Sequence, residues 1–319
     1  MRLFRKFLNR YIFFYVFLRR SKDFLRGYYP EQLGYFVLKM RSRNPKTFQQ
    51  KIFYKMAYDR RNIVTLFADK VLVRDYVAKI IGNQYLIPIY GIYQTPEEIS
   101  LNDLPDKCVI KPSHGSGAIL IFSTRNQNSS FTVMSNKFEN WKRIEIQKSA
   151  ISEADFKLLL KGWLKTPYHN GFGHFPEFAY KGVTPKLIIE DLLTLEDEIA
   201  ADYRFFIFNG VCEYIEVDQS WNESPTRDMF NSNWQKLDVK LKYPNAKKSP
   251  VRPSNLGHMI HLAEKLACNV DHLRVDFYLI GDRIYFGELT NYHTGGKQIF
   301  EPRSFNTIFS KSWDPTTYY

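Results

Sequence analysis

The segment RVDFYLIGDRIYFGELTNYHTGG, residues 274–296, constrains the fold of this chain more than any other. It reads as two β-strands joined by a turn, yet Arg274, Asp276 and Glu288 stand where a buried strand is normally apolar. Because side chains alternate across a strand, Arg274 and Asp276 share one face of the first strand. This set of charges predicts a polar site on one face of a β-sheet.

The length of the loop at Gly281-Asp282 decides whether the two carboxylates meet. A two-residue turn would place Asp276 and Glu288 on opposite faces, whereas a loop of three or five residues would place them opposite each other. Facing carboxylates repel unless a cation lies between them, and hard oxygen ligands suit Mg²⁺. We therefore expect an odd-residue loop with a metal site. For either carboxylate alone, exposure to solvent is the alternative.

A second motif, KCVIKPSHGSGAILIFS at residues 107–123, predicts a phosphate-binding loop. Lys111 ends an apolar strand, so its ammonium group emerges at the end of that strand. The glycines of the loop, Gly115 and Gly117 on either side of Ser116, allow backbone amides to approach a phosphate closely. The GxxxxGK[ST] pattern of a P-loop is absent, and a simple hairpin turn is the alternative for this loop.

The remaining sequence has the pattern of an α/β (α+β) protein. Helical periodicity and capping residues predict helices between residues 44 and 82, at 152–165 and at 254–269. An apolar run at 85–94 predicts a strand, and Asn209-Gly210 is the strongest signal for a two-residue hairpin turn. No internal repeat is present.

The basic residues are concentrated at the N-terminus. Residues 1–61 hold 16 Lys and Arg against three acidic residues, whereas the rest of the chain holds 29 against 30. This distribution predicts a basic, helical N-terminal segment on a neutral globular body and no nucleic-acid partner. The run RYIFFYVFLRR, residues 10–20, has eight apolar residues, far fewer than the roughly 20 that span a bilayer. It predicts contact with an anionic membrane surface, or a helix packed on its own domain.

The cysteines indicate a reducing compartment. They are few and widely spaced, with no CxxC pair, which argues against a disulfide framework or a structural zinc site. They are Cys108, Cys212 and Cys268. A cytoplasmic protein is therefore expected.

Eight segments occur in an order that resembles the TupA-like (teichuronopeptide biosynthesis) ATP-grasp family, from about residue 45 to about residue 302. They are NPKTF, DRR, FADKVLVRDYV, IGNQYLIPIYG, LPDKCVIKPSHGSG, PKLIIEDLL, DYRFFIFNG and RVDFYLIGDRIYFGELTNY. The resemblance implies an ATP-grasp fold that holds a nucleotide between two α+β subdomains. It implies an ATP-grasp domain at 62–310, with a lid at about 105–195, a metal and catalytic subdomain at about 196–302, and a tail at 311–319.

The resemblance also implies residues that bind the nucleotide. Lys70 and Lys111 match the two lysines that reach its phosphates in ATP-grasp enzymes. Glu190 matches the hinge position near the adenine or ribose, where Leu192 or Leu193 would supply backbone contacts. The loop over the phosphates corresponds to His114, Gly115, Ser116 and Gly117.

The same resemblance implies catalytic and metal-binding residues. Asp276 and Glu288 match the magnesium carboxylates, and Arg274 matches the arginine that neutralises an acyl phosphate. Arg204 matches a basic position facing the phosphates, and Lys111 also contributes there. Thr290 departs from the pattern, because many members have Asn at that position; here Asn291 follows it.

The function implied by the resemblance is ATP-dependent ligation with ATP and Mg²⁺ as cofactors. A carboxylate attacks the γ-phosphate, and an amine captures the acyl phosphate to give an amide. Because the family is associated with cell-surface polysaccharides, we expect a small-molecule or lipid-linked saccharide substrate, with an amino acid and a uronic acid joined at the inner face of the cytoplasmic membrane. Two alternatives remain open: a glycosyltransferase, although the DxD signature is absent, and a non-catalytic nucleotide-binding membrane adaptor.

Overall fold

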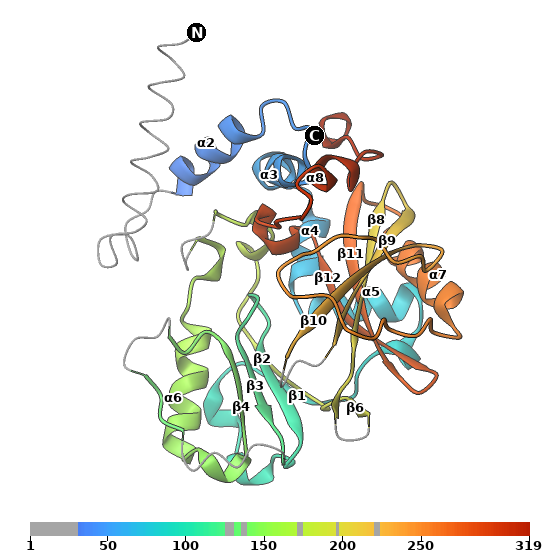
Figure 1. The fold of residues 1–319 in the computed structure, drawn as a ribbon. Helices are drawn as coiled ribbons and strands as arrows, with labels where there is room; N and C mark the ends of the chain where they lie inside the picture. The colour runs from blue at the N-terminus through green and yellow to red at the C-terminus, as the bar shows by residue number, and fades with distance from the viewer. Residues whose placement is uncertain (1–30, 125–130, 135–138, 171–174, 196–197, 220–223) are drawn as a thin grey trace.

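The computed structural model describes residues 31–124, 131–134, 139–170, 175–195, 198–219 and 224–319. Its strands form two five-stranded sheets and a two-stranded ladder, and Figure 1 shows the larger sheets in two neighbouring parts of the molecule, each with its own helices. This mixture confirms the predicted α/β (α+β) class. The predicted membrane-contacting run 10–20 lies outside the described residues. Within the described part of the chain, no helix has the length and apolar character needed to cross a bilayer.

The first sheet has the strand order β1-β5-β2-β3-β4 and contains the predicted phosphate loop between β2 and β3. Helix α6 (Glu153–Leu164) covers one face of this sheet, where Phe156 and Trp163 pack with apolar side chains of β2 and β3. Ser152 caps the helix by accepting a hydrogen bond from the amide of Asp155, so the predicted start is confirmed. The strands are β1 (Ile89–Tyr93), β2 (Cys108–Pro112), β3 (Ile119–Phe122), β4 (Arg143–Ile146) and β5 (Leu187–Glu190).

The second sheet is antiparallel and has the strand order β10-β9-β8-β11-β12. Its strands are β8 (Asp202–Phe208), β9 (Val211–Gln219), β10 (Thr226–Asn231), β11 (His272–Ile280) and β12 (Arg283–Thr290). One face is apolar, and Phe205 and Phe277 on it pack with residues of α5 (Leu72–Ile80) and α7 (Leu256–Leu266). The predicted turn at Asn209-Gly210 is confirmed, with φ of 50° and 82° as a type I′ turn requires.

The opposite face of the second sheet has an aromatic part and a charged part. On β8, Phe206 and Phe208 pack edge-on against Phe48 of α3 (Phe48–Tyr58). Arg204, two residues before Phe206, pairs with Asp276 across the ladder. The aromatic part is therefore covered by a helix, and the charged part continues from it along the same face.

Buried lysines join α3 to the C-terminal end of the chain. Lys55 is fully buried, and its Nζ lies 2.7 Å from Oδ1 of Asp271 and 3.1 Å from the hydroxyl of Tyr319. Lys51 donates a 2.6 Å hydrogen bond to the carbonyl of Ser310. Parts of the predicted basic segment and of the predicted tail thus pack on the second sheet, while the proposed domain boundaries stay predictions. The other elements are α2 (Glu31–Arg41), α4 (Asn62–Ala68), α8 (Phe305–Ile308), β6 (Thr194–Leu195) and β7 (Glu198–Ile199).

The hairpin of β11 and β12 combines a wrong prediction with a correct one. The loop is a two-residue turn, because Ile280 pairs with Arg283, so the expected odd-residue loop is wrong. A β-bulge then shifts the register between Phe277 and Asp276, and Asp276 lies opposite Glu288 as predicted. The extra residue of the bulge is Gly287, where an added Cβ would come 3.1 Å from the carbonyl oxygen of Asp276. The bulge, and not the loop, brings the carboxylates together.

We expect Lys55→Met to lower the free energy of unfolding by about 1.5–3 kcal/mol, because the buried Asp271 loses its closest cation and keeps only Arg61, 3.0 Å away, as a charged partner. Methionine fills similar space, so the loss reports the missing charge. Urea denaturation measures it, with Lys46→Met at an exposed position as the control, expected to change stability by less than about 0.5 kcal/mol. A loss below about 1 kcal/mol, the range of a surface pair, would contradict the buried-pair interpretation.

Candidate active site

Two adjoining cavities lie where the charged face of the second sheet meets the first sheet and its connections. The larger has a volume of about 360 Å³, and its lining includes Ser116, Arg274 and Glu288. The smaller is lined by residues that include Lys70 and Lys111. Glu288 lines both cavities, so the two spaces meet at the end of β12.

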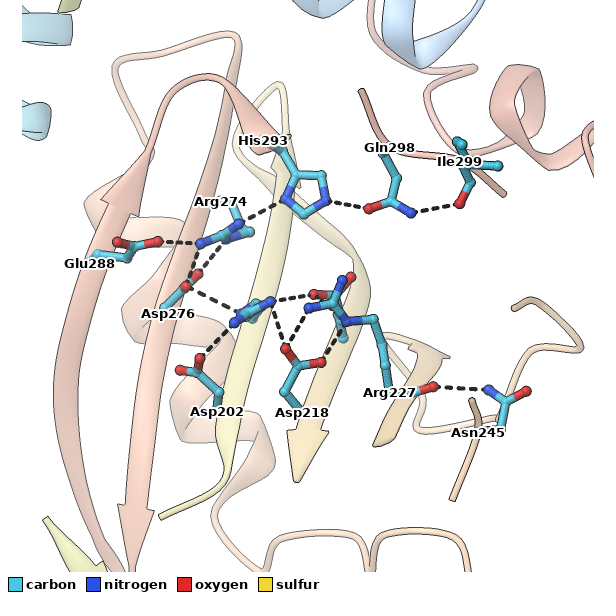
Figure 2. Close-up of polar contacts among 12 residues, drawn as sticks. Asp202, Asp218, Arg227, Asn245, Arg274, Asp276, Glu288, His293, Gln298 and Ile299 are labelled. Atoms are coloured by element: carbon cyan, nitrogen blue, oxygen red, sulfur yellow. Dashed lines mark hydrogen bonds and ion pairs between the residues drawn. The ribbon is translucent and has the colours of Figure 1, made fainter. Parts of the chain in front are cut away.

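Arg274 joins the two opposed carboxylates of the hairpin (Figure 2). Its Nε donates a 2.7 Å hydrogen bond to Oδ1 of Asp276, and its Nη2 donates a 2.6 Å hydrogen bond to Oδ2. The same Nη2 contacts Oε1 of Glu288, and Oε1 also accepts a 2.8 Å hydrogen bond from Thr290. The guanidinium thus binds Asp276 in a bidentate manner and holds Glu288 beside it.

The two carboxylates differ in their titration. Burial raises the pKa of Asp276 above its ordinary value; Arg274 opposes this rise, and the charge of Glu288 adds to it. Burial alone would also raise the pKa of Glu288, but Arg274 and Lys70 lower it to about 2. Glu288 is half-exposed toward the cavities, so it is the ionised carboxylate that a bound cation would meet first.

A network of buried charges continues from Asp276 across the sheet. Arg204 lies 3.5 Å from Asp276 through Nε, 2.8 Å from Asp202 through Nη2, and 2.7 and 2.8 Å from Glu216 and Asp218 through Nη1. Arg227 on β10 binds Asp218 from the other side (Figure 2). The network with Arg274 and Glu288 contains five carboxylates and three arginines. Burial raises the pKa of both Asp202 and Asp276, which partly offsets the excess of carboxylates over arginines in this network.

His293 fixes the remaining side of Arg274. The Nη1 of Arg274 donates a 2.8 Å hydrogen bond to Nδ1 of His293, and Nε2 of His293 lies 3.1 Å from Oε1 of Gln298 (Figure 2). An arginine can only donate, so Nδ1 must accept and Nε2 must carry the proton. Burial, together with Arg274, holds the pKa of His293 well below its ordinary value, which keeps the ring neutral and able to accept.

The predicted nucleotide-binding lysines meet at the smaller cavity. Lys111 on β2 forms an ion pair with Glu190 at the end of β5, and both residues line this cavity. Lys70 also lines it, and its Nζ donates a hydrogen bond to the carbonyl of Gly115. Burial lowers the pKa of Lys70 to about 8, although Glu288 raises it. The structure therefore brings Lys70, Lys111 and Glu190 together beside Glu288.

Two other predicted residues, His114 and Leu193, lie away from the two cavities. His114 is buried, and its Nε2 lies 3.1 Å from the carbonyl of Thr166. Leu193 accepts a hydrogen bond from the amide of Ala200 and lines neither cavity. In the loop of the first sheet, Ser116 lines the larger cavity and Gly117 has a φ of 94° that only glycine adopts easily.

Four residues of the charged network were not predicted as site residues. They are Asp202, Glu216, Asp218 and Arg227. Their signal in the sequence is alternation, because Glu216 and Asp218 stand two residues apart and alternate with the apolar Ile215 and Val217. Charges at that spacing share one face of a strand, but their partner strands follow only from the order of the sheet.

The donors at this site fit Mg²⁺. Asp276, Glu288 and Asn291 offer only oxygen ligands, which Mg²⁺ prefers. Asn291 is buried at the larger cavity, and its Oδ1 receives no hydrogen bond from any described residue. No group of three His, Cys, Asp or Glu residues suited to a metal occurs in the described part of the chain, so water and phosphate oxygens would complete the coordination.

Three solved structures are similar to this chain, but only distantly. A D-alanine–D-alanine ligase from Helicobacter pylori is 13% identical with a TM-score of 0.36, over 79% of this chain and 58% of that chain. The ATP-grasp ligase PsnB with its minimal precursor is 8% identical with a TM-score of 0.36, over 72% and 53%. An N5-carboxyaminoimidazole ribonucleotide synthetase from Thermus thermophilus is 12% identical with a TM-score of 0.34, over 71% and 45%. This chain spans about half the length of these proteins, and scores this low support no argument about substrates.

Comparison with protein families gives a clearer result. A search of the curated proteins finds no match. The family model described as TupA-like ATPgrasp matches residues 50–313, which cover both sheets, both cavities and every residue of the charged network. This match spans most of the chain and confirms the family and the ATP-grasp fold expected from the eight ordered segments. The chain belongs to the TupA-like ATP-grasp family.

Proposed function

We propose that this protein is an ATP-dependent carboxylate–amine ligase that forms an amide through an acyl-phosphate intermediate. The observation that carries the proposal is the position of Arg274 between Asp276 and Glu288, in a cavity adjoining the one lined by Lys70 and Lys111. Cations at two adjoining cavities suit a triphosphate on one side and a phosphorylated carboxylate on the other.

The residues suit phosphoryl transfer without a covalent protein intermediate. Lys70 and Lys111 would bind the nucleotide phosphates, with Glu190 beside them. Arg274 stays charged at any physiological pH and would neutralise the acyl phosphate in the larger cavity. Held by Asp276 and Glu288, Mg²⁺ would supply further neutralisation of phosphate charge. The protein thus contributes position and charge, which this chemistry requires.

The substrates that we infer are a uronic acid and an amino acid, joined during the assembly of a cell-surface polysaccharide. The family relationship supports this inference, and so does a polar cavity lined by Tyr168, Asn291 and Lys297 among others. We further infer that the protein acts in the cytoplasm at an anionic membrane surface, because residues 1–61 contain 16 basic residues and only three acidic ones.

We expect purified protein with ATP and Mg²⁺ to release ADP only when a carboxylate and an amine are both present, because the acyl phosphate needs an amine to turn over. A coupled assay for ADP, with uronic acids and amino acids supplied singly and in pairs, measures this. Release of UDP from a UDP-sugar without use of ATP would support the glycosyltransferase alternative. Tight binding of ATP with no turnover in any pair would support the adaptor alternative.

We expect Asp276→Asn and Glu288→Gln each to lower kcat by at least about 100-fold, because each removes a negative charge that the metal site needs. Both amides keep the size of the side chain, and the half-exposed Glu288 should tolerate the change without loss of fold, as circular dichroism would report. Asp282→Asn, at the exposed turn of the same hairpin, is the matched control and should keep full activity. Wild-type turnover in Glu288→Gln would remove the metal assignment.

A further inference from the structure

Glu177 is a buried acid in the larger cavity that the ligase chemistry described above does not use. Glu177 is 7% exposed and lines the same cavity as Arg274 and Glu288. Its Oε1 lies beside Gly295, because a Cβ added at that glycine would come 3.6 Å from this oxygen. The carboxylate thus occupies a defined place in the cavity wall, apart from the charged face of the second sheet.

The backbone around Glu177 is well anchored. Its amide donates a 2.8 Å hydrogen bond to the carbonyl of His169, and its own carbonyl accepts a 3.1 Å hydrogen bond from the amide of Tyr180. The next residue, Phe178, packs beneath the guanidinium of Arg60 with 4.8 Å to the ring centroid. These contacts fix the backbone of Glu177 at the wall of the cavity.

Two tyrosines connect Glu177 with the reacting end of the cavity. The rings of Tyr168 and Tyr180 pack edge to face, with 4.8 Å between centroids, and both side chains line the cavity. Burial raises the pKa of each tyrosine, and the charges of Glu177 and Glu288 add to that rise in both cases. Glu177 and Glu288 therefore border the same tyrosine-lined cavity.

The carboxyl group of Glu177 suits an amino group, because near pH 8 it is present in both its ionised and its protonated form. Burial raises the pKa of Glu177 to about 8, although Lys297 lowers it. A general base is most effective when its pKa lies near the working pH, and an amino group with a pKa near 8 is a matched partner. Arg274 lines the same cavity and suits an anion, so the cavity can hold an amino group and a phosphorylated carboxylate together.

We propose that Glu177 receives the amine substrate: its carboxylate binds the ammonium group and accepts one of its protons before the amine attacks the acyl phosphate. This inference rests on the proposed ligase function and names the residue that selects the amine. An ammonium ion has no lone pair, so attack requires this proton transfer first.

The step balances in atoms and charge. One proton passes from the ammonium nitrogen to a carboxylate oxygen of Glu177, leaving a neutral amine. The amine nitrogen forms a bond to the acyl carbon, and the carbon–oxygen bond to phosphate breaks with its electron pair on the departing phosphate. The nitrogen then loses its second proton to phosphate or water, and Glu177 returns its proton to solvent.

The test compares two nucleophiles in wild-type protein and in Glu177→Gln. Hydroxylamine is uncharged near neutral pH and traps an acyl phosphate as a hydroxamate without a base, whereas an amino group must first lose a proton. With ATP and Mg²⁺, glucuronate and the common amino acids are supplied as carboxylates, and hydroxylamine, amino acids or glucosamine as nucleophiles. Mass spectrometry measures hydroxamate and amide. The control is Glu97→Gln, which changes an exposed glutamate that lines neither cavity.

We expect Glu177→Gln to lower kcat/KM for amide formation by at least about 100-fold while hydroxamate formation stays within about threefold of wild type. Glu177→Asp, which keeps a carboxylate, should recover part of the amide formation. Amide formation at the wild-type rate in Glu177→Gln, or equal loss of both products, would overturn the role of Glu177. The role of Glu177 would also be overturned if the wild-type protein formed hydroxamate but formed no amide with any of the amines supplied. No hydroxamate from any carboxylate would instead overturn the ligase function itself.

Discussion

The contact of Arg274 with Asp276 and Glu288 is the interaction on which the rest of this structure depends. Charges buried in a sheet are costly unless each has partners of good geometry. Arg274 binds two carboxylates on neighbouring strands. One of them, Asp276, also lies 3.5 Å from Arg204, which has buried carboxylate partners of its own. The network therefore ties β8, β9, β10, β11 and β12 together along one face, while the apolar face beneath packs on α5 and α7.

The need of a buried charge for a partner also explains why one lysine of the basic N-terminal part lies inside the fold and not in solvent. Lys55 is fully buried in α3 and pairs with Asp271 at the start of β11, and Trp313 donates a 2.8 Å hydrogen bond to the other oxygen of that carboxylate. The helix and the C-terminal residues thus cover the aromatic part of the sheet face. A count of charges along the sequence does not distinguish Lys55 from exposed arginines, although Lys55 compensates the buried Asp271.

Local patterns predicted the turn at Asn209-Gly210, the cap at Ser152 and the facing of Asp276 and Glu288. The facing of Asp276 and Glu288 is correct only because a bulge at Gly287 shifts the register of the hairpin. A glycine in a strand can indicate a bulge, but the register that results also depends on the length of the turn. Asp202 and the acids of β9 were missed because strand order, which brings them to Arg204, is a long-range property. What the sequence could not supply was the pairing, since it depends on contacts between distant segments.

The hydrogen bonds of Arg274 also limit how the site can work. A guanidinium has five N–H donors, and the contacts to Asp276, Glu288 and His293 use four of them. The fifth belongs to Nη1 on a side chain that lines the larger cavity. An anion bound there can gain a hydrogen bond without displacing either carboxylate, provided that His293 remains a neutral acceptor. Protonation of His293 would turn Nδ1 into a donor and repel the arginine, so the buried and neutral state of this ring is what holds Arg274 ready for a substrate.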